Sequence, residues 1–267
     1  MMNVLFVHQN FPGQYQHLAP ALVGRGHRVI AIGQEGCGPA PAGIETRLYR
    51  LSRGNAPQVH PFAVEFEAKT LRGEACGRLA LDLRAAGFIP DVILAHPGWG
   101  EALYLKDVFP DARLIGFAEF YYRSSGQDMG FDPEFPALTF ADLARLRGKN
   151  ANLLVALEAM DWGVAPTHWQ ASTHPAWVRG KLSIIHDGVD TDRIAPDPAA
   201  EIRLPDRRVR IRPGDEVLTF VARHLEPVRG YHVFMRALPE ILARRPRAKA
   251  FIVGGDGASY GARYYRE

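Results

Sequence analysis

The stretch that decides the fold covers residues 6–33 and reads FVHQNFPGQYQHLAPALVGRGHRVIAIG. The continuous apolar run Val4–Val7 is typical of a parallel strand that is buried on both faces. A Pro12-Gly13 turn follows, and Leu18–Gly24 then has the apolar spacing of a helix that glycine ends. His27–Ile32 is the next apolar run. Together these segments predict a strand, a helix and a second strand, which is one βαβ unit.

The same alternation continues along the chain. Further strands are expected at 92–95, 113–118, 162–165 and 182–185, with helices at 62–86, 101–108, 137–160 and near Trp169. Strands that alternate with helices predict a parallel sheet with helices on both sides. The fold class is therefore α/β, with a Rossmann-like N-terminal domain.

Four prolines interrupt this pattern between residues 187 and 214. We interpret the segment as an interdomain linker that also holds an edge strand around Val209–Ile211. A strand at Val217–Ala222, a helix at Tyr231–Arg244 and a strand at Ala250–Val253 follow, and they form a new βαβ unit. We expect an N-terminal domain at 1–186, a linker at 187–214 and a partial second domain at 215–267.

Composition excludes several classes of protein. The formal net charge of +3 is too small for this length to indicate nucleic-acid binding. Two cysteines, Cys37 and Cys76, do not make a disulfide framework and favour a reducing cytosol. The N-terminus has no basic region, and its apolar run is too short for a signal peptide or membrane span. We expect a cytoplasmic protein that is soluble or peripheral at the inner face of the membrane.

Four stretches, in order, resemble glycosyltransferase family 4. The first is 6–33, where Gly26-His27-Arg28-Val29 matches the family's entry into its second strand. The others are APTHWQ at 165–170, IIHDGVD at 184–190 and VARHLEPVRG at 221–230. The resemblance implies a GT-B fold, in which two Rossmann-like domains face each other across a cleft. It also implies a retaining transferase that uses a nucleotide-diphosphate sugar.

The chain departs from the family pattern in two respects. Arg229 stands where the family usually has lysine, so a planar fork replaces a point charge. The family's pair of glutamates, which contacts the donor sugar and ribose, has no counterpart after Gly257, where only the terminal Glu267 is acidic. We therefore expect the whole N-terminal half of the enzyme but only the opening of its donor-binding half.

The loop at 221–230 is the predicted site for the donor diphosphate. Arg223, Arg229 and Gly230 precede the helix that begins near Tyr231, and phosphate groups favour helix N-termini with basic side chains. Positive groups there would stabilise the charge that develops as the diphosphate leaves. The alternative is that both arginines are solvated surface residues.

The predicted catalytic residues are His96 and Glu119, each of which follows a strand. Ligands of open α/β sheets bind at the carboxyl ends of the strands. The resemblance implies that His96 contacts the donor sugar, although a histidine at a strand end is often structural. His8 is another candidate of this kind. Asp128 and Asp132 flank a glycine-bearing loop, and we interpret them as surface residues of the acceptor loop.

The donor and acceptor cleft is predicted to include Asn10, Gly13 and Gly98. The resemblance implies that Gly13 lets the backbone approach the donor, while the alternative is a plain tight turn. A single glycine does not make a dinucleotide motif. No metal-ligand spacing is present, and the resemblance implies an enzyme without metal or cofactor.

A basic stretch lies near the expected linker and comprises Arg203, Arg207, Arg208, Arg210 and Arg212. We favour an exposed edge strand with polar outward positions. The alternative is contact with anionic membrane lipid.

The favoured function is sugar transfer from a nucleotide-diphosphate donor to a glycan or lipid-linked acceptor, with retention of configuration. Family resemblance implies that the donor phosphate itself receives the acceptor proton. The alternatives are an inactive fragment or binding module, and a GT-B-like sugar-nucleotide epimerase. Sequence does not name the donor base, the sugar, the acceptor or the linkage.

Overall fold

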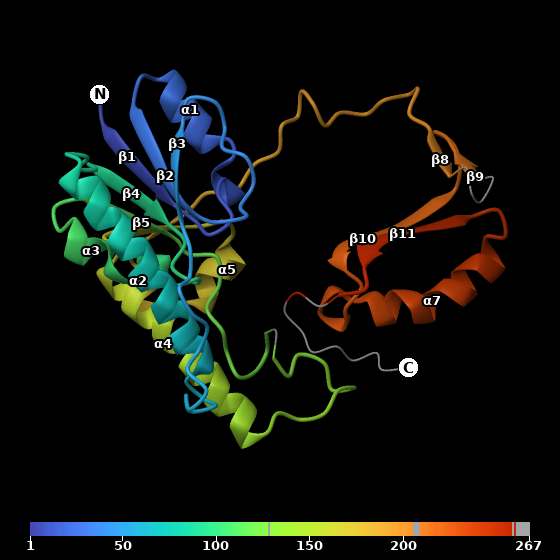
Figure 1. The fold of residues 1–267 in the computed structure, drawn as a ribbon. Helices are drawn as coiled ribbons and strands as arrows, with labels where there is room; N and C mark the ends of the chain where they lie inside the picture. The colour runs from blue at the N-terminus through green and yellow to red at the C-terminus, as the bar shows by residue number, and fades with distance from the viewer. Residues whose placement is uncertain (128, 205–208, 258, 260–267) are drawn as a thin grey trace. The chain divides into compact units, whose positions relative to one another are not determined.

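A computed structural model of the chain divides it into two compact units, residues 1–187 and 188–267. The structure describes residues 1–127, 129–204, 209–257 and 259 (Figure 1). The expectations for Asp128, Arg207, Arg208 and Glu267 fall outside the described residues.

The first unit is built on a seven-stranded sheet whose order is β3-β2-β1-β4-β5-β6-β7. All six neighbouring pairs are parallel. The strands are β1 (Asn3–Val7), β2 (Arg28–Gln34), β3 (Glu45–Tyr49), β4 (Val92–Ala95), β5 (Arg113–Phe117), β6 (Trp162–Ala165) and β7 (Leu182–Ile184). The expected α/β class and the GT-B type of fold are confirmed.

Helices cover both faces of this sheet. They are α1 (Leu18–Gly24), α2 (Val64–Ala85), α3 (Leu105–Val108), α4 (Phe140–Ala159), α5 (His168–Thr173) and α6 (Ala176–Arg179), with short 3-10 helices at Gly13–Tyr15 and Glu101–Tyr104. On one face, Leu5 and Val7 of β1 share a buried cluster with residues of α2 and α4. On the other face, Val4 and Phe6 share a second cluster with Ala19 of α1. Burial on both faces explains why β1 reads as an uninterrupted apolar run.

The strands and long helices expected in the first unit are confirmed, most of them to within a few residues. Strand β3 (Glu45–Tyr49) was missed, because it lies at the edge of the sheet and only Tyr49 is buried. An edge strand exposes much of its length to water, so its sequence carries no apolar run.

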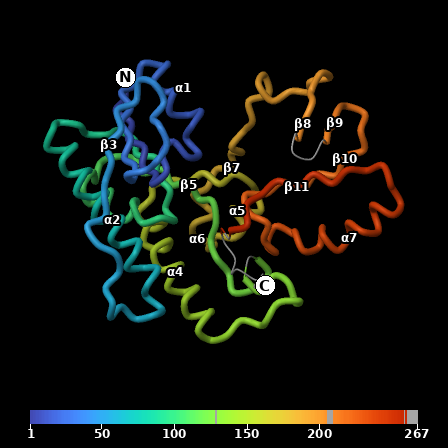
Figure 2. Tube along the Cα trace, turned by 45° about the vertical axis from the view of Figure 1, so that its right-hand side comes forward, coloured from blue at the N-terminus to red at the C-terminus, as the bar shows by residue number. Residues whose placement is uncertain are grey.

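The second unit holds two small sheets. Strands β8 (Ile202–Leu204) and β9 (Val209–Ile211) pair antiparallel, within the segment for which a linker is expected. Strands β10 (Val217–His224) and β11 (Lys249–Gly255) pair parallel. Helix α7 (Tyr231–Arg244) connects them and runs beside them (Figure 2). The expected βαβ unit is confirmed.

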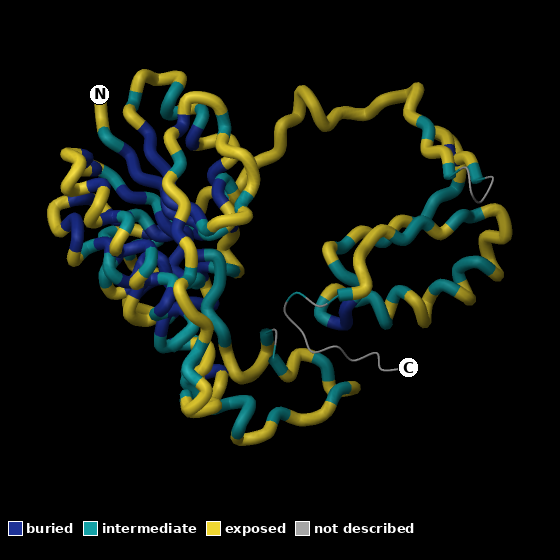
Figure 3. The backbone as a smooth tube through the Cα atoms, in the orientation of Figure 1, coloured by how far each residue is buried: buried dark blue, intermediate teal, exposed yellow. Residues whose placement is uncertain are grey.

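Burial differs between the units. The interior of the first unit consists of buried strands and helix faces, whereas most of the second unit is intermediate or exposed (Figure 3). Helix α7 has no fully buried residue, and its contact with β10 includes the ring pair Phe220–Phe234, whose centroids lie 5.2 Å apart. Among the described residues, no helix combines the length and apolar character needed to cross a membrane.

Candidate functional site

His96 and Glu119 lie together at the carboxyl edge of the first sheet. His96 directly follows β4, and Glu119 lies two residues beyond β5, the neighbouring strand. The Nε2 atom of His96 lies 3.0 Å from Oε2 of Glu119. The imidazole is buried, with 8% of its side chain exposed, whereas 37% of the Glu119 side chain is exposed. The pair therefore meets solvent through its carboxylate.

The backbone fixes the tautomer of His96. The N–H of Gly98 donates to Nδ1 of His96 at 3.0 Å, so Nδ1 acts as an acceptor. A neutral imidazole that accepts at one nitrogen carries its proton on the other. Nε2–H therefore donates to the Glu119 carboxylate.

Tight packing holds the loop after β4. A Cβ atom on Gly98 would lie 2.8 Å from Cε1 of His96, and a Cβ on Gly100 would lie 2.2 Å from the carbonyl oxygen of Lys69. Gly100 also has a φ of +111°, which glycine adopts without strain. The buried side chain of Asn152 on α4 donates to the carbonyl of Pro97 at 3.1 Å. These contacts hold the loop and restrict the His96 ring.

The segment that carries Glu119 is fixed to α5 and α4. The backbone N–H of Tyr121 donates to the hydroxyl oxygen of Thr173 at 3.1 Å. The guanidinium of Arg123 donates to the carbonyl of Thr173, and Asn150 donates to the carbonyl of Tyr122 at 2.7 Å. Glu119 is thus held at the edge by the residues that follow it.

A second histidine loop follows β1. The backbone N–H of Asn10 donates to Nδ1 of His8 at 3.0 Å, in the same i+2 arrangement as at His96. Gly13 has a φ of +47°, and a Cβ there would lie 2.7 Å from Cε1 of His8. The rings of His8 and His96 are 5.9 Å apart and meet edge to face. Burial, followed by the neighbouring His96, lowers the pKa of His8 to about 4.

The two histidines stand at the switch point of the sheet. From β1 the order runs outward through β2 and β3, and from β4 it runs outward in the other direction through β5, β6 and β7. Ligands of open α/β sheets bind outside the strand ends at such a reversal. His8 and His96 follow the two strands between which the order reverses.

A buried polar pair supports the same edge. The Tyr49 hydroxyl, at the end of β3, donates to Oε1 of Glu101 at 2.5 Å. Glu101 is 2% exposed, and its burial raises the pKa of its carboxyl group. Burial, with Glu101 beside it, also raises the pKa of Tyr49. Glu101 directly follows Gly100, so this pair anchors the far end of the His96 loop.

In the second unit, the predicted diphosphate residues lie on one loop. Arg223 is exposed near the end of β10, and Arg229 is exposed with its Nε 3.6 Å from the buried carboxylate of Glu226. Gly230 has a φ of +77° and is the N-cap residue of α7. Its left-handed backbone is one that glycine adopts readily. The structure thus places Arg229 just before the start of α7 and Arg223 near the end of β10, and their role in binding stays a prediction.

The basic stretch forms ion pairs with a single carboxylate. Glu201 pairs with Arg203, Arg210 and Arg212, of which the Arg212 pair measures 3.2 Å. The hydrogen bonds from Arg210 and Arg203 lower the pKa of Glu201. The expected strand at Val209–Ile211 is confirmed, and contact with anionic lipid stays an alternative hypothesis.

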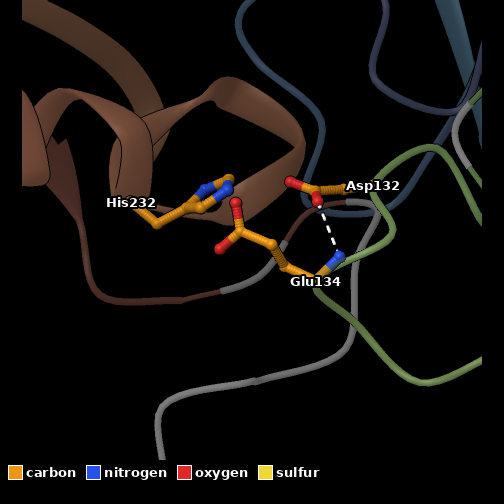
Figure 4. A group of neighbouring side chains, drawn as sticks. All are labelled: Asp132, Glu134 and His232. Carbon is orange, nitrogen blue, oxygen red and sulfur yellow. Dashed lines mark hydrogen bonds between the residues drawn. The ribbon is translucent and has the colours of Figure 1, made fainter.

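Asp132 lies on the expected acceptor loop, and its carboxylate accepts the backbone N–H of Glu134 at 2.9 Å (Figure 4). This is a local turn within the first unit. His232, also labelled in Figure 4, is near the start of α7 in the second unit. Asp132 is partly buried and Glu134 is exposed, which fits the interpretation of this loop as surface.

Comparison with known proteins decides the family. The sequence profile of the glycosyl transferase family 4 group matches residues 25–194. The chain belongs to this family. The match covers most of the first unit, including the loops that hold His96 and Glu119.

Two curated relatives of this family 4 chain carry the same name, GDP-mannose-dependent alpha-(1-6)-phosphatidylinositol monomannoside mannosyltransferase. The protein of Mycobacterium tuberculosis strain H37Rv is 27% identical over 265 residues, which is 96% of this chain and 61% of the relative. That of Mycolicibacterium smegmatis is 44% identical over 74 residues, or 28% of this chain and 19% of the relative. The family 4 chain thus spans less than two thirds of either relative.

Solved structures share the fold at low identity. The catalytic domain of starch synthase IV from Arabidopsis thaliana, bound to ADP and acarbose, is 13% identical with a TM-score of 0.58. It matches 95% of this chain and 68% of its own. UDP-GlcNAc 2-epimerase from Neisseria meningitidis is 14% identical with a TM-score of 0.50, over 94% of this chain and 65% of its own. Transferases and epimerases thus share this fold, and only the family match separates them.

Sequence reasoning missed several residues that build the site of this family 4 chain. Asn152 and Glu101 lie inside helical segments, where their polarity suggests a solvent face, yet both are buried. Tyr49 lies on the missed edge strand. A signal was available for Glu101 alone, because it lies three residues after Gly98, a predicted cleft residue.

Proposed function

We propose that this family 4 protein transfers a sugar from a nucleotide-diphosphate donor to a hydroxyl group of a glycan or lipid-linked acceptor, with retention of configuration. The observation that carries the proposal is the His96–Glu119 pair at the switch point of a family 4 sheet. A buried imidazole with a fixed tautomer and a partly exposed carboxylate can orient a polyhydroxylated ligand.

In this proposal His96 and Glu119 act as one unit. The N–H of His96 is already engaged by Glu119 at 3.0 Å. A carboxylate can accept several hydrogen bonds, so Glu119 can also accept from sugar hydroxyls while His96 holds it in place. If Glu119 turns toward the ligand, the His96 N–H becomes available to a sugar oxygen. In the first arrangement Glu119 contacts the transferred sugar and His96 positions Glu119. In the second arrangement both residues contact the sugar.

Arg223 and Arg229 are proposed to bind the donor diphosphate with Gly230 and the start of α7. Helix α7 has 14 residues, and its first N–H groups carry the partial positive charge of a helix N-terminus. Charge-assisted hydrogen bonds from guanidinium groups to phosphate are strong and favour bidentate geometry. Such groups would stabilise the departing diphosphate and the transition state that precedes it.

GDP-mannose is the donor to test first, because the relatives above are named for it. Their names also give a phosphatidylinositol mannoside as acceptor, so a lipid-linked acceptor is the matching proposal here. We further propose that the protein works in the cytoplasm, at the inner face of the membrane. Catalysis without metal is part of the proposal, and unchanged initial rates after EDTA treatment would support it.

The experiment measures sugar transfer by the protein expressed from its native gene. GDP-mannose and UDP-glucose are supplied with a lipid-linked mannoside, and NMR of the product gives the configuration of the new bond. The Arg223→Ala variant is expected to lower kcat/KM about a hundredfold, as loss of a charged contact in the transition state does.

Arg244→Ala is the matched control, because Arg244 is an exposed arginine of the same unit that pairs on the surface with Glu240. It should keep wild-type activity. Full activity of Arg223→Ala would remove the diphosphate role. Binding without transfer by the native gene product would favour a binding module, and conversion of the nucleotide sugar without transfer would favour an epimerase.

A further inference from the structure

His8 is nearly enclosed, yet one of its nitrogens is left unused. The residue is 6% exposed, and its Nδ1 accepts the N–H of Asn10. Its Nε2 has no hydrogen-bond partner among the residues that the structure describes. That atom is not fully enclosed by the surrounding protein. Nε2 therefore reaches solvent, at the carboxyl edge of β1.

The state of this nitrogen follows from the other one. Because Nδ1 accepts a hydrogen bond, a neutral ring carries its proton on Nε2. Burial and the adjacent His96 ring hold the pKa of His8 at about 4, so the ring is neutral near pH 7. His8 thus presents one uncharged N–H donor at the switch point.

An uncharged donor indicates the chemistry of its partner. Phosphate oxygens are bound best by cationic or helix N-terminal donors. A neutral imidazole N–H is suited instead to an uncharged oxygen, such as a sugar hydroxyl. Glu119, whose carboxylate is hydrogen-bonded to the neighbouring His96 ring, supplies a complementary acceptor.

We propose that His8 is a second sugar-binding residue, whose Nε2–H donates a hydrogen bond to a hydroxyl oxygen of the donor hexose or of the acceptor glycan. This inference rests on the proposed function. The proposal assigns different roles to the two nitrogens of the His8 ring: Nδ1 holds the loop, and Nε2 binds the ligand. His96 differs because its Nε2–H is already bound to Glu119.

Two substitutions distinguish the roles of these two nitrogens. In His8→Gln, the longer side chain places an amide N–H near the position of Nε2. In His8→Asn, the shorter side chain places its carbonyl near Nδ1, where it can accept the Asn10 N–H as asparagine does in turns. Steady-state kinetics are measured on the native gene product, with GDP-mannose and the lipid-linked mannoside varied separately.

If the proposal holds, His8→Gln keeps kcat/KM within about threefold of wild type, while His8→Asn loses about tenfold, the effect of one hydrogen bond. A loss in kcat/KM for GDP-mannose alone places the hydroxyl on the donor, and a loss for the mannoside alone places it on the acceptor. The reverse order, with His8→Asn active and His8→Gln impaired, overturns the proposal and leaves His8 a purely structural residue.

If the wild-type protein has no transferase activity, both the proposed function and this inference are wrong. If the wild type is active but His8→Asn is more active than His8→Gln, only this inference is wrong. Long-range ¹H–¹⁵N spectra of the histidine-labelled wild type give a test that needs no variant. They should show His8 with its proton on Nε2 at pH 7, and a proton on Nδ1 or a charged ring would overturn the proposal.

Discussion

After β1, the N–H of Asn10 donates to Nδ1 of His8, and after β4 the N–H of Gly98 donates to Nδ1 of His96. In each loop a glycine leaves room for the ring. The loops differ in what the second nitrogen does. Nε2 of His96 donates to Glu119, whereas Nε2 of His8 has no partner among the described residues.

This difference shows how one local arrangement can serve two purposes. Local backbone geometry fixes the tautomer of both rings, because each N–H donor lies two residues from its histidine. The second nitrogen depends on the neighbouring strand. Strand β5 brings Glu119 to His96, whereas no carboxylate of the described residues forms a hydrogen bond with His8. The comparison can be tested by changing the carboxylate, the glycines, the pH and the outer anchor of one loop.

The largest expected effect comes from removing the carboxylate. Glu119→Ala should lower kcat/KM by about a hundredfold or more, because it removes both the ligand contact and the partner of His96. His96→Phe should cost a similar factor. Combining the two should cost little more, since residues that act as a unit are not additive.

Steady-state kinetics with the proposed donor and acceptor check this expectation. Glu74→Ala is the control, because Glu74 is an exposed carboxylate on α2 that pairs with Arg78. Multiplicative losses in the double variant would show that His96 and Glu119 act independently.

Alanine substitutions at Gly98 and Gly13 should affect different quantities, the first mainly kcat/KM and the second mainly the free energy of unfolding. In Gly98→Ala the new Cβ would meet the His96 ring at 2.8 Å and displace it, with about a tenfold loss of kcat/KM. In Gly13→Ala the Cβ would meet the His8 ring at 2.7 Å, and the φ of +47° adds backbone strain, so about 1–3 kcal/mol of unfolding free energy is lost.

Urea unfolding and kinetics of both variants measure this contrast. Gly24→Ala serves as the control, because nothing lies within 4 Å of a Cβ built there. A Gly13→Ala variant as stable as wild type would mean that the loop after β1 adjusts without cost.

The third prediction concerns pH. The pKa of His8 is about 4 in the native state and 6.5 as its ordinary value, so the unfolded chain binds more protons between these values. The unfolding free energy should therefore fall as pH drops from about 6.5 toward 4, by up to about 1.4 kcal/mol per pH unit from this residue. Above pH 6.5 its contribution is constant.

His8→Gln should remove this part of the slope, as urea unfolding at several pH values would show. His17→Gln, a change at an exposed histidine, is the control. An unchanged slope in His8→Gln would mean that His8 titrates alike in both states. His174, whose pKa burial also lowers, contributes in the same direction and stays present in both proteins.

The smallest effect is expected at the outer anchor of the His96 loop. Asn152→Ala removes the hydrogen bond to the Pro97 carbonyl and should lower the unfolding free energy by about 1 kcal/mol. Its Oδ1 is buried without a hydrogen bond among the described residues, so removing the amide also relieves a cost. Urea unfolding measures this change. A loss of unfolding free energy above about 3 kcal/mol would indicate that the substitution also leaves a cavity.

Much of the first unit could be predicted from its sequence. The apolar runs of β1, β2 and β4 mark strands buried on both faces, and their order along the chain predicts parallel pairing. His96 and Glu119 were identified as residues at strand ends. Strand β3 was missed because an edge strand needs few apolar residues, and Asn152 because a buried amide in a helix resembles a solvated one.

The sequence by itself determined the α/β class, the βαβ start of the second unit and the family, because periodicity and short motifs are local properties. Only the tertiary structure decided that Glu119 binds His96, that Glu101 and Tyr49 are paired in the interior, and that His8 keeps one open nitrogen. Those facts depend on which strands become neighbours and which side chains lose water, and residues far apart in the chain settle both.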